Sequence, residues 1–158
     1  MRDKKCTPDV QITFQPFTIS NDGTSPLHEA HGCQFVLRLL RPRSRGVIGR
    51  NGSIDPRYFT HEDDARVLQD AVLFVKNDIA KRPSIASIVD TLVAERLESS
   101  GVNGGSCANY VDLQTHGVHN TSHLYVCDGS TLPFPISGAL TPYKLALADI
   151  FVDTLKQR

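Results

Sequence analysis

Three histidines and two cysteines lie close together in the second half of the chain, and side chains of these types can hold a metal ion. They are His116, His119, His123, Cys107 and Cys127. Zinc sites usually pair their ligands as CxxC or HxxxH on one turn or helix. Here two of the histidines fall in a predicted loop and the third at the start of a predicted strand. We therefore predict surface histidines and no metal site.

Two other segments carry residue types that suit contact with a cofactor. Asp128-Gly129 follows an apolar stretch, and a glycine there lets backbone approach a flat ligand without a Cβ in the way. Thr141-Pro142 opens an apolar helical pattern, and the free N–H groups of a helix start favour negative charge. Taken alone, these segments favour an ordinary turn and an ordinary helix cap over a cofactor contact.

Other chemistries have weaker support. Arginines at 38, 41, 43, 45 and 50 form a local basic patch, but no aromatic residues alternate with them, so we predict solvated turn arginines and no nucleic-acid partner. A Ser-His-Asp hydrolase is disfavoured because the chain has no GxSxG elbow.

Composition is that of an ordinary globular domain. The 158 residues contain 17 Lys and Arg against 17 Asp and Glu, so no net field favours nucleic acid or an anionic membrane. No apolar run reaches the length of a membrane span, and the charged first residues do not read as a signal peptide. Neither observation assigns a cellular compartment.

Hydrophobic periodicity predicts the elements that must position these groups. In order, they are strands over 10–17 and 33–40, an edge strand near 47–48, helices over 60–82 and 84–98, a buried strand over 123–127 and a helix from 141. This order favours an α+β fold, an antiparallel sheet with flanking helices, over a doubly wound parallel sheet.

Two of the helices have specific predicted starts and buried faces. Thr60 with Asp63 resembles a capping box, and Thr141 with Pro142 reads as an N-cap followed by the first helical residue. The predicted inward stripes are Leu68, Val72, Val75 and Ile79 in the first helix, and Leu145, Ala148, Val152 and Leu155 in the last.

Three segments, in order, resemble the C-terminal region of the glucose–methanol–choline (GMC) oxidoreductases. That family typically reads LxRPxSRG and IDPxYL, then VVD…VxGV, then NLYVVDASxxP…NPxxTxxALA. The corresponding segments are 39–46 (LLRPRSRG) with 54–59 (IDPRYF), 111–118 (VDLQTHGV), and 123–130 (HLYVCDGS) with 132–133 (LP) and 141–148 (TPYKLALA). Their order and spacing make a chance match improbable.

The resemblance implies a fold and a cofactor. It assigns 10–158 to a GMC C-terminal domain, similar to the family's substrate domain and incomplete without the FAD-binding half, after a disordered segment 1–9. It implies FAD as cofactor, contacted by Asp128 and Gly129, with Thr141 and Pro142 at the flavin edge. It also implies an alcohol or sugar as substrate.

The chain departs from the family pattern at two points. No GxGxxG unit is present, since the glycines of 101–105 follow a predicted helix and lead into a polar loop. The family's catalytic His precedes a GT/GSxR box, and aligning Gly105-Ser106 with that box places Val102 at the His position. In another register the His segment is missing. Thr141, at the position of the partner His or Asn, is no base at neutral pH.

We therefore assign no catalytic residue and no metal ligand from the sequence. The expected function is that of the C-terminal portion of an FAD-dependent oxidoreductase acting on CH–OH groups, inactive by itself. The alternative is a non-catalytic fragment, or a sugar-binding or interaction module derived from the family.

Overall fold

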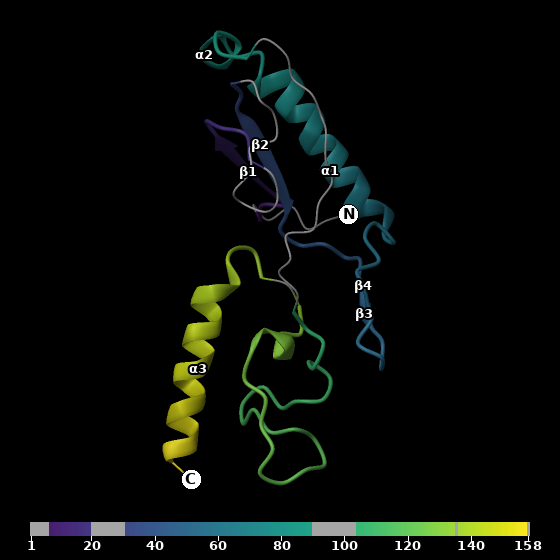
Figure 1. Ribbon diagram of the computed structural model, residues 1–158, viewed down its shortest axis with the longest axis vertical. Helices are drawn as coiled ribbons and strands as arrows, with labels where there is room; N and C mark the ends of the chain where they lie inside the picture. The colour runs from purple at the N-terminus through teal and green to yellow at the C-terminus, as the bar shows by residue number, and fades with distance from the viewer. Residues whose placement is uncertain (1–6, 20–30, 90–103, 135, 158) are drawn as a thin grey trace. The chain divides into compact units, whose positions relative to one another are not determined.

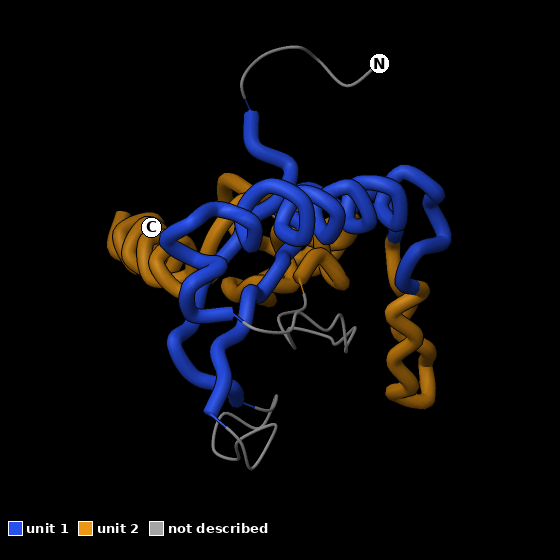
Figure 2. The backbone as a smooth tube through the Cα atoms, turned by 90° about the horizontal axis from the view of Figure 1, so that it is seen from above, with its two compact units in different colours: residues 1–44, 58–98 blue, residues 45–57, 99–158 orange. Residues whose placement is uncertain are grey.

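The computed structural model describes residues 7–19, 31–89, 104–134 and 136–157, and Figure 1 shows their helices and strands. The chain forms two compact units, each built from two stretches of sequence and coloured separately in Figure 2. Unit 1 comprises Met1–Ser44 and Tyr58–Glu98, and unit 2 comprises Arg45–Arg57 and Ser99–Arg158. Small antiparallel sheets and helices make up both units, so the predicted α+β class is confirmed.

Unit 1 contains an antiparallel pair of strands, β1 (Val10–Gln15) and β2 (Gln34–Leu39). Their register pairs Val10 with Leu39 and Gln15 with Gln34. The Phe14 and Phe35 rings meet across the pair with their centroids 5.2 Å apart, a contact that stabilises this register. Both strands lie within the ranges predicted from the alternation of apolar and polar residues.

The helix α1 (Glu62–Phe74) packs on both strands, as Figure 1 shows, and continues into a π-helical turn, η1 (Val75–Ile79). The predicted cap at Thr60 is wrong by one residue. The N-cap is His61, whose Nδ1 accepts a hydrogen bond from the Asp63 amide at 3.3 Å. The acidic first turn lies as predicted at the positive end of the helix dipole.

The predicted stripe of α1 is confirmed in part, because Val75 is buried as predicted. Ala71 and Val75 are buried with Asp64, whereas Leu68 and Val72 are only half-buried. Asp64 is buried because it binds a neighbouring loop. Tertiary packing therefore selected a line that a hydrophobicity count does not favour.

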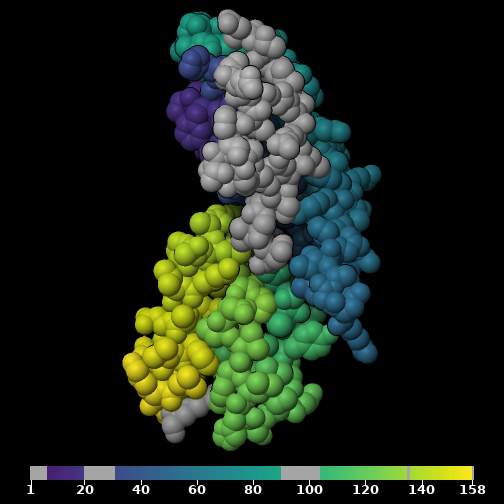
Figure 3. Space-filling model, viewed as in Figure 1, coloured from purple at the N-terminus to yellow at the C-terminus, as the bar shows by residue number. Residues whose placement is uncertain are grey.

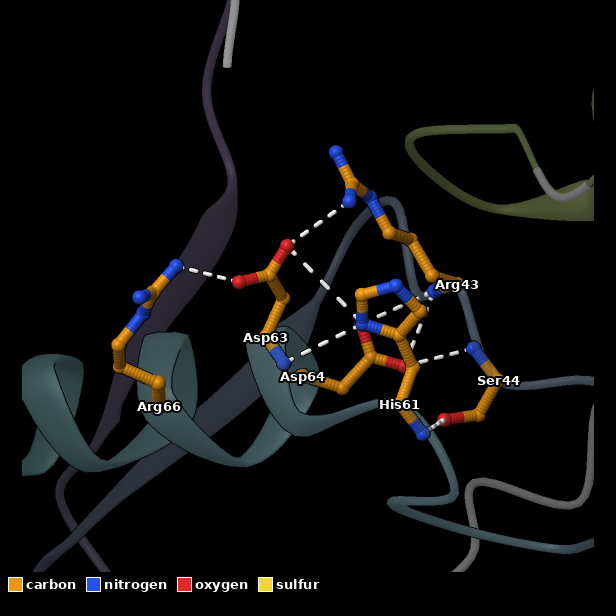
Figure 4. A network of polar contacts seen from close by, with 6 residues as sticks. All are labelled: Arg43, Ser44, His61, Asp63, Asp64 and Arg66. Atoms are coloured by element: carbon orange, nitrogen blue, oxygen red, sulfur yellow. Dashed lines mark hydrogen bonds and ion pairs between the residues drawn. The ribbon is translucent and has the colours of Figure 1, made fainter. Parts of the chain in front are cut away.

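The buried carboxylate of Asp64 joins the start of α1 to the loop that follows β2 (Figure 4). Both its oxygens accept from the Arg43 amide at 2.9 Å, and Oδ2 also accepts from the Ser44 amide at 2.8 Å. Burial alone raises the pKa of Asp64, but the hydrogen bonds from Ser44 and Arg43 outweigh it and lower that pKa overall. The Asp64 carboxylate is thus an anion with a structural role, and both its oxygens accept hydrogen bonds.

Around this carboxylate, exposed pairs complete the network in Figure 4. Asp63 pairs with the Arg43 guanidinium at 2.8 Å and with Arg66. The Ser44 hydroxyl accepts from the His61 amide at 3.1 Å. Two of the arginines in the basic patch, Arg41 and Arg43, are therefore paired with Asp9 and Asp63, in agreement with a structural role for them.

After η1, the helix α2 (Pro83–Ala86) is a single turn, with Arg82 as N-cap. The sequence predicts a helix to residue 98, and its part from residue 90 lies outside the described residues. The segment of 1–9 that was predicted to be disordered also lies largely outside them.

In unit 2, β3 (Val47–Ile48) pairs with β4 (Ile54–Asp55) in a short antiparallel hairpin. The predicted edge strand at 47–48 is thus confirmed. Gly52 adopts a φ of +80° in the connecting turn, with no atom within 4 Å of the position that a Cβ would occupy.

The rest of unit 2 is an irregular segment that packs on the helix α3 (Leu140–Lys156), as the green and yellow regions of Figure 3 show. The predicted strand over 123–127 is wrong. Only isolated bridges form, Gly117 with Tyr125 and Val111 with Val118. His123 has a φ of +58°, which interrupts an extended strand, and Leu124 is 52% exposed.

The buried face of α3 also differs from the prediction. Leu147 is buried and Phe151 is half-buried, whereas three of the four predicted inward residues are large and exposed: Leu145, Val152 and Leu155. The Phe151 ring packs against His116 and Tyr125, with centroid distances of 5.1 Å and 5.8 Å. Because α3 is apolar on more than one side, these aromatic contacts decide which side is covered.

Candidate cofactor-contact site

The Asp128–Thr131 segment forms a tight turn that begins the candidate site. Asp128 is the extended N-cap of a 3₁₀ turn, η2 (Gly129–Thr131), and its carboxylate accepts from the Ser130 amide at 2.7 Å. The Thr131 hydroxyl donates to the Asp128 carbonyl at 2.9 Å. Asp128 itself is exposed, whereas Gly129 and Thr131 are buried. Of the predicted Asp128-Gly129 pair, Asp128 therefore presents the accessible group.

The charge of Asp128 is stabilised by its surroundings. Hydrogen bonds from the Ser130 hydroxyl and amide lower the pKa of Asp128, and the positive charge of Lys144 lowers it further. The neighbouring thiol shifts the other way, because burial and the charge of Asp128 raise the pKa of Cys127. Asp128 is thus a stable anion beside an un-ionised thiol, a pair that can accept hydrogen bonds but cannot supply a nucleophile.

The first turns of α3 lie next to this segment. The Cys127 Sγ is 3.6 Å from the Leu147 carbonyl oxygen, and Lys144 is close enough to act on Asp128. The structure therefore brings the Asp128 turn and the beginning of α3 together within unit 2. Lys144 and Leu147 were not predicted from the sequence, because nothing in the helical pattern specifies which side of α3 faces the turn.

The start of α3 differs from the predicted cap. The helix begins at Leu140, and its N-cap is Ala139, which has no side chain to accept a hydrogen bond. Thr141 and Pro142 lie in the first turn and are exposed. The predicted N-cap is wrong because Thr141 and Pro142 match the residue types of an N-cap and a first helical residue, whereas the helical backbone begins at Leu140. The backbone N–H groups of the first turn have no acceptor within α3, so they lie at its N-terminal end without an intrahelical hydrogen bond.

Segment 104–107 packs backbone against backbone on the Asp128 turn. The Gly105 amide donates to the Gly129 carbonyl at 3.1 Å, and the Cys107 amide donates to the Ser130 carbonyl at 2.8 Å. No functional role was predicted for these glycines, because they match no dinucleotide fingerprint. The adjacent Gly104-Gly105 pair was the signal that could have revealed a close backbone approach.

His116 is a buried residue and not the surface histidine that was predicted. It is 1% exposed, and among the described residues neither ring nitrogen has a hydrogen-bond partner. Its backbone has a φ of +58°, and a turn stabilised by Asp112 precedes it. Asp112 accepts from the Thr115 amide and hydroxyl, and these bonds lower the pKa of Asp112. Turn geometry and Phe151 together place the ring inside unit 2.

Two other features of the described residues are relevant to function. Within them, no group of three or more His, Cys, Asp or Glu side chains is arranged to hold a metal ion, and no helix combines the length and apolarity needed to cross a membrane. Unit 1 carries an apolar groove of about 530 Å³, formed by the side of α1 and the residue Phe59. With Gln69 as its single polar lining residue, this groove offers little to orient a substrate.

The chain's relatives are oxidoreductases of the GMC family, and the chain matches the C-terminal part of these longer proteins, which confirms the resemblance seen in the sequence. They are oxygen-dependent choline dehydrogenases. That of Ectopseudomonas mendocina is 27% identical over 96% of this chain and 31% of its own length. That of Cronobacter sakazakii is 25% identical over 99% of this chain and 33% of its own length.

The oxygen-dependent choline dehydrogenase of Stenotrophomonas maltophilia is 26% identical over 96% of this chain and 32% of its own length. The chain therefore spans about a third of the length of the curated relatives that it matches. No protein-family model matches the chain. The similarity extends through both units, so it is not carried by the Asp128 turn alone.

Proposed function

We propose that this chain is the C-terminal portion of an FAD-dependent oxidoreductase that acts on the CH–OH group of an alcohol or sugar. The observation that carries the proposal is the agreement of two findings. Choline dehydrogenases match almost the whole chain, and the matched segment that resembles the family's cofactor motif forms an exposed carboxylate turn beside the start of a helix. The likeness of 10–158 to the family's substrate domain is part of the proposal.

The residues present fit such a cofactor. FAD carries ribityl and ribose hydroxyls, and an ionised carboxylate is a strong acceptor for hydroxyl donors. Asp128 is exposed and its pKa is lowered, so it offers this acceptor at neutral pH. Gly129 gives the turn a backbone with no side chain, and the first turn of α3, with Thr141 and Pro142, offers a partial positive charge to the flavin edge.

FAD, when bound, supplies a hydride acceptor for the oxidation of an alcohol. The chain's own contribution is to orient the cofactor and to place a helix end near it. No described residue of the Asp128 turn can act as a base, because Asp128 is held as a weakly basic anion and Cys127 as a thiol. We therefore expect the chain by itself to oxidise no alcohol. Because the relatives are named for choline, choline is the first substrate to test in a complete enzyme.

A titration of the 158-residue chain with FAD tests the cofactor contact. We expect weak, saturable quenching of flavin fluorescence, and about tenfold weaker binding by Asp128→Ala, the equivalent of one lost hydrogen bond to a charged group. Asp153→Ala, which removes another exposed aspartate of unit 2, is the matched control and should bind like the parent. No saturable binding, or equal binding by Asp128→Ala, would contradict the proposal and support the non-catalytic alternative.

A further inference from the structure

Segment 104–107 approaches the Asp128 turn more closely than side chains would allow. A Cβ on Gly104 would lie 2.9 Å from the Gly129 carbonyl oxygen, and a Cβ on Gly105 would lie 2.9 Å from the Leu132 carbonyl oxygen. Both neighbours are backbone atoms, which cannot rotate away as a flexible side chain can. Gly105 also has a φ of +84°, a conformation that other residues adopt at a cost.

The close approach allows two hydrogen bonds to form on the turn. The amides of Gly105 and Cys107 donate to the carbonyls of Gly129 and Ser130. These two acceptors belong to the residues that follow Asp128, and the Ser130 amide in turn donates to the Asp128 carboxylate at 2.7 Å. A shift of segment 104–107 would therefore move Ser130, and it would change the hydrogen bond from the Ser130 amide to the Asp128 carboxylate.

We propose that Gly104 and Gly105 are positioning residues, whose lack of side chains lets segment 104–107 brace the turn that presents Asp128 to the cofactor. This inference rests on the proposed function for the identity of the ligand. The bracing itself is a property of unit 2 and can be measured without FAD. The two glycines act through the turn, and we propose no direct contact between them and the cofactor.

The experiment compares glycine-to-alanine variants in the full chain, with two readouts. The first is the pH titration of the Asp128 carboxyl followed by carbon-detected NMR, and the second is FAD binding measured by fluorescence quenching. In Gly104→Ala and Gly105→Ala the turn must shift, the Ser130 hydrogen bonds weaken, and the Asp128 midpoint should rise toward its ordinary value. FAD binding should weaken about tenfold, as for the loss of one hydrogen bond to the carboxylate.

Gly52→Ala is a matched control for Gly105→Ala. Gly52 has almost the same backbone angle, +80° against +84°, but no atom lies within 4 Å of its Cβ position. The two substitutions therefore carry a similar penalty from positive φ, and only Gly105→Ala adds the contact with the turn. Gly52→Ala should leave both the Asp128 midpoint and FAD binding unchanged.

The outcomes separate the two ideas. An unmoved Asp128 midpoint in folded Gly104→Ala and Gly105→Ala overturns the positioning role. If the Asp128 midpoint rises in the two variants but the parent chain binds no FAD, the proposed function is overturned and the bracing stands.

Amide hydrogen exchange in the parent chain gives a test that does not depend on variants that fold. The amides of Gly105 and Cys107 should exchange at least about tenfold more slowly than the amide of the exposed loop residue Gly138, after correction for intrinsic rates. Equal rates would overturn the bracing.

Discussion

Unit 1 and unit 2 each bury a polar side chain to the same extent, but the two side chains differ in how they are satisfied. Asp64 in unit 1 and His116 in unit 2 are both 1% exposed. Asp64 accepts from the amides of Arg43 and Ser44, whereas neither nitrogen of His116 has a partner among the described residues. A buried polar group stabilises a fold only when its hydrogen bonds are made. Burial alone therefore does not say whether a polar side chain supports its unit.

The two units also attach their loops by different means. In unit 1 a charged side chain binds the backbone of the loop after β2, so that attachment depends on the protonation of one carboxylate. In unit 2 the backbone amides of Gly105 and Cys107 bind backbone carbonyls, and the close approach at Gly104 and Gly105 depends on the absence of a Cβ. The first should respond to pH and the second to side-chain volume.

The largest expected effect is at Asp64. Asp64→Ala removes the acceptor of the part-buried Arg43 and Ser44 amides and should lower the free energy of unfolding by about 2 to 3 kcal/mol. Urea denaturation followed by circular dichroism measures this change. Asp70→Ala, which removes an exposed aspartate from the same helix, should change stability by less than about 0.5 kcal/mol. Equal effects of the two substitutions would show that the carboxylate does not stabilise unit 1.

Acid should weaken unit 1 through the same residue. The folded-state pKa of Asp64 is lowered from 3.8, so its contribution is fully present above that value and is lost as the pH falls through the lowered pKa. Exchange of the Arg43 and Ser44 amides, corrected for intrinsic rates, should accelerate over that range. In Asp64→Asn, which does not titrate, this part of the pH dependence should vanish. Its persistence would assign the acid response to other carboxylates.

The smallest expected effect is at His116, and it would sharpen the contrast with Asp64. His116→Leu replaces the imidazole by an apolar side chain, and it removes no side-chain hydrogen bond that the described part of the chain makes. The loss of the edge-on contact with Phe151 opposes the gain from removing unsatisfied nitrogens, so stability should change by less than about 1 kcal/mol in either direction. Thermal denaturation measures it. A loss of about 3 kcal/mol, similar to that of Asp64→Ala, would show that His116 has a bonding partner in solution.

Much of the local structure could be predicted from the sequence. Alternation of Val10, Ile12 and Phe14 with polar residues predicts β1, and the acidic residues before an apolar repeat predict α1, because both signals arise from local backbone geometry. The ordinary alternative for Asp128-Gly129-Ser130 was a turn, and the structure contains a turn there. These features need only residues close together in the chain.

Tertiary structure alone decided which faces are covered and which polar groups are buried. Asp64 is buried because a loop 20 residues away in sequence binds it, and α3 turns Leu147 and Phe151 inward because His116 and Tyr125 lie there. Gly104 and Gly105 are confined by backbone atoms of residues 129 and 132, which lie far along the chain. Helical periodicity predicts which side chains share a face of a helix. Which of these faces is buried depends on contacts with residues far along the chain.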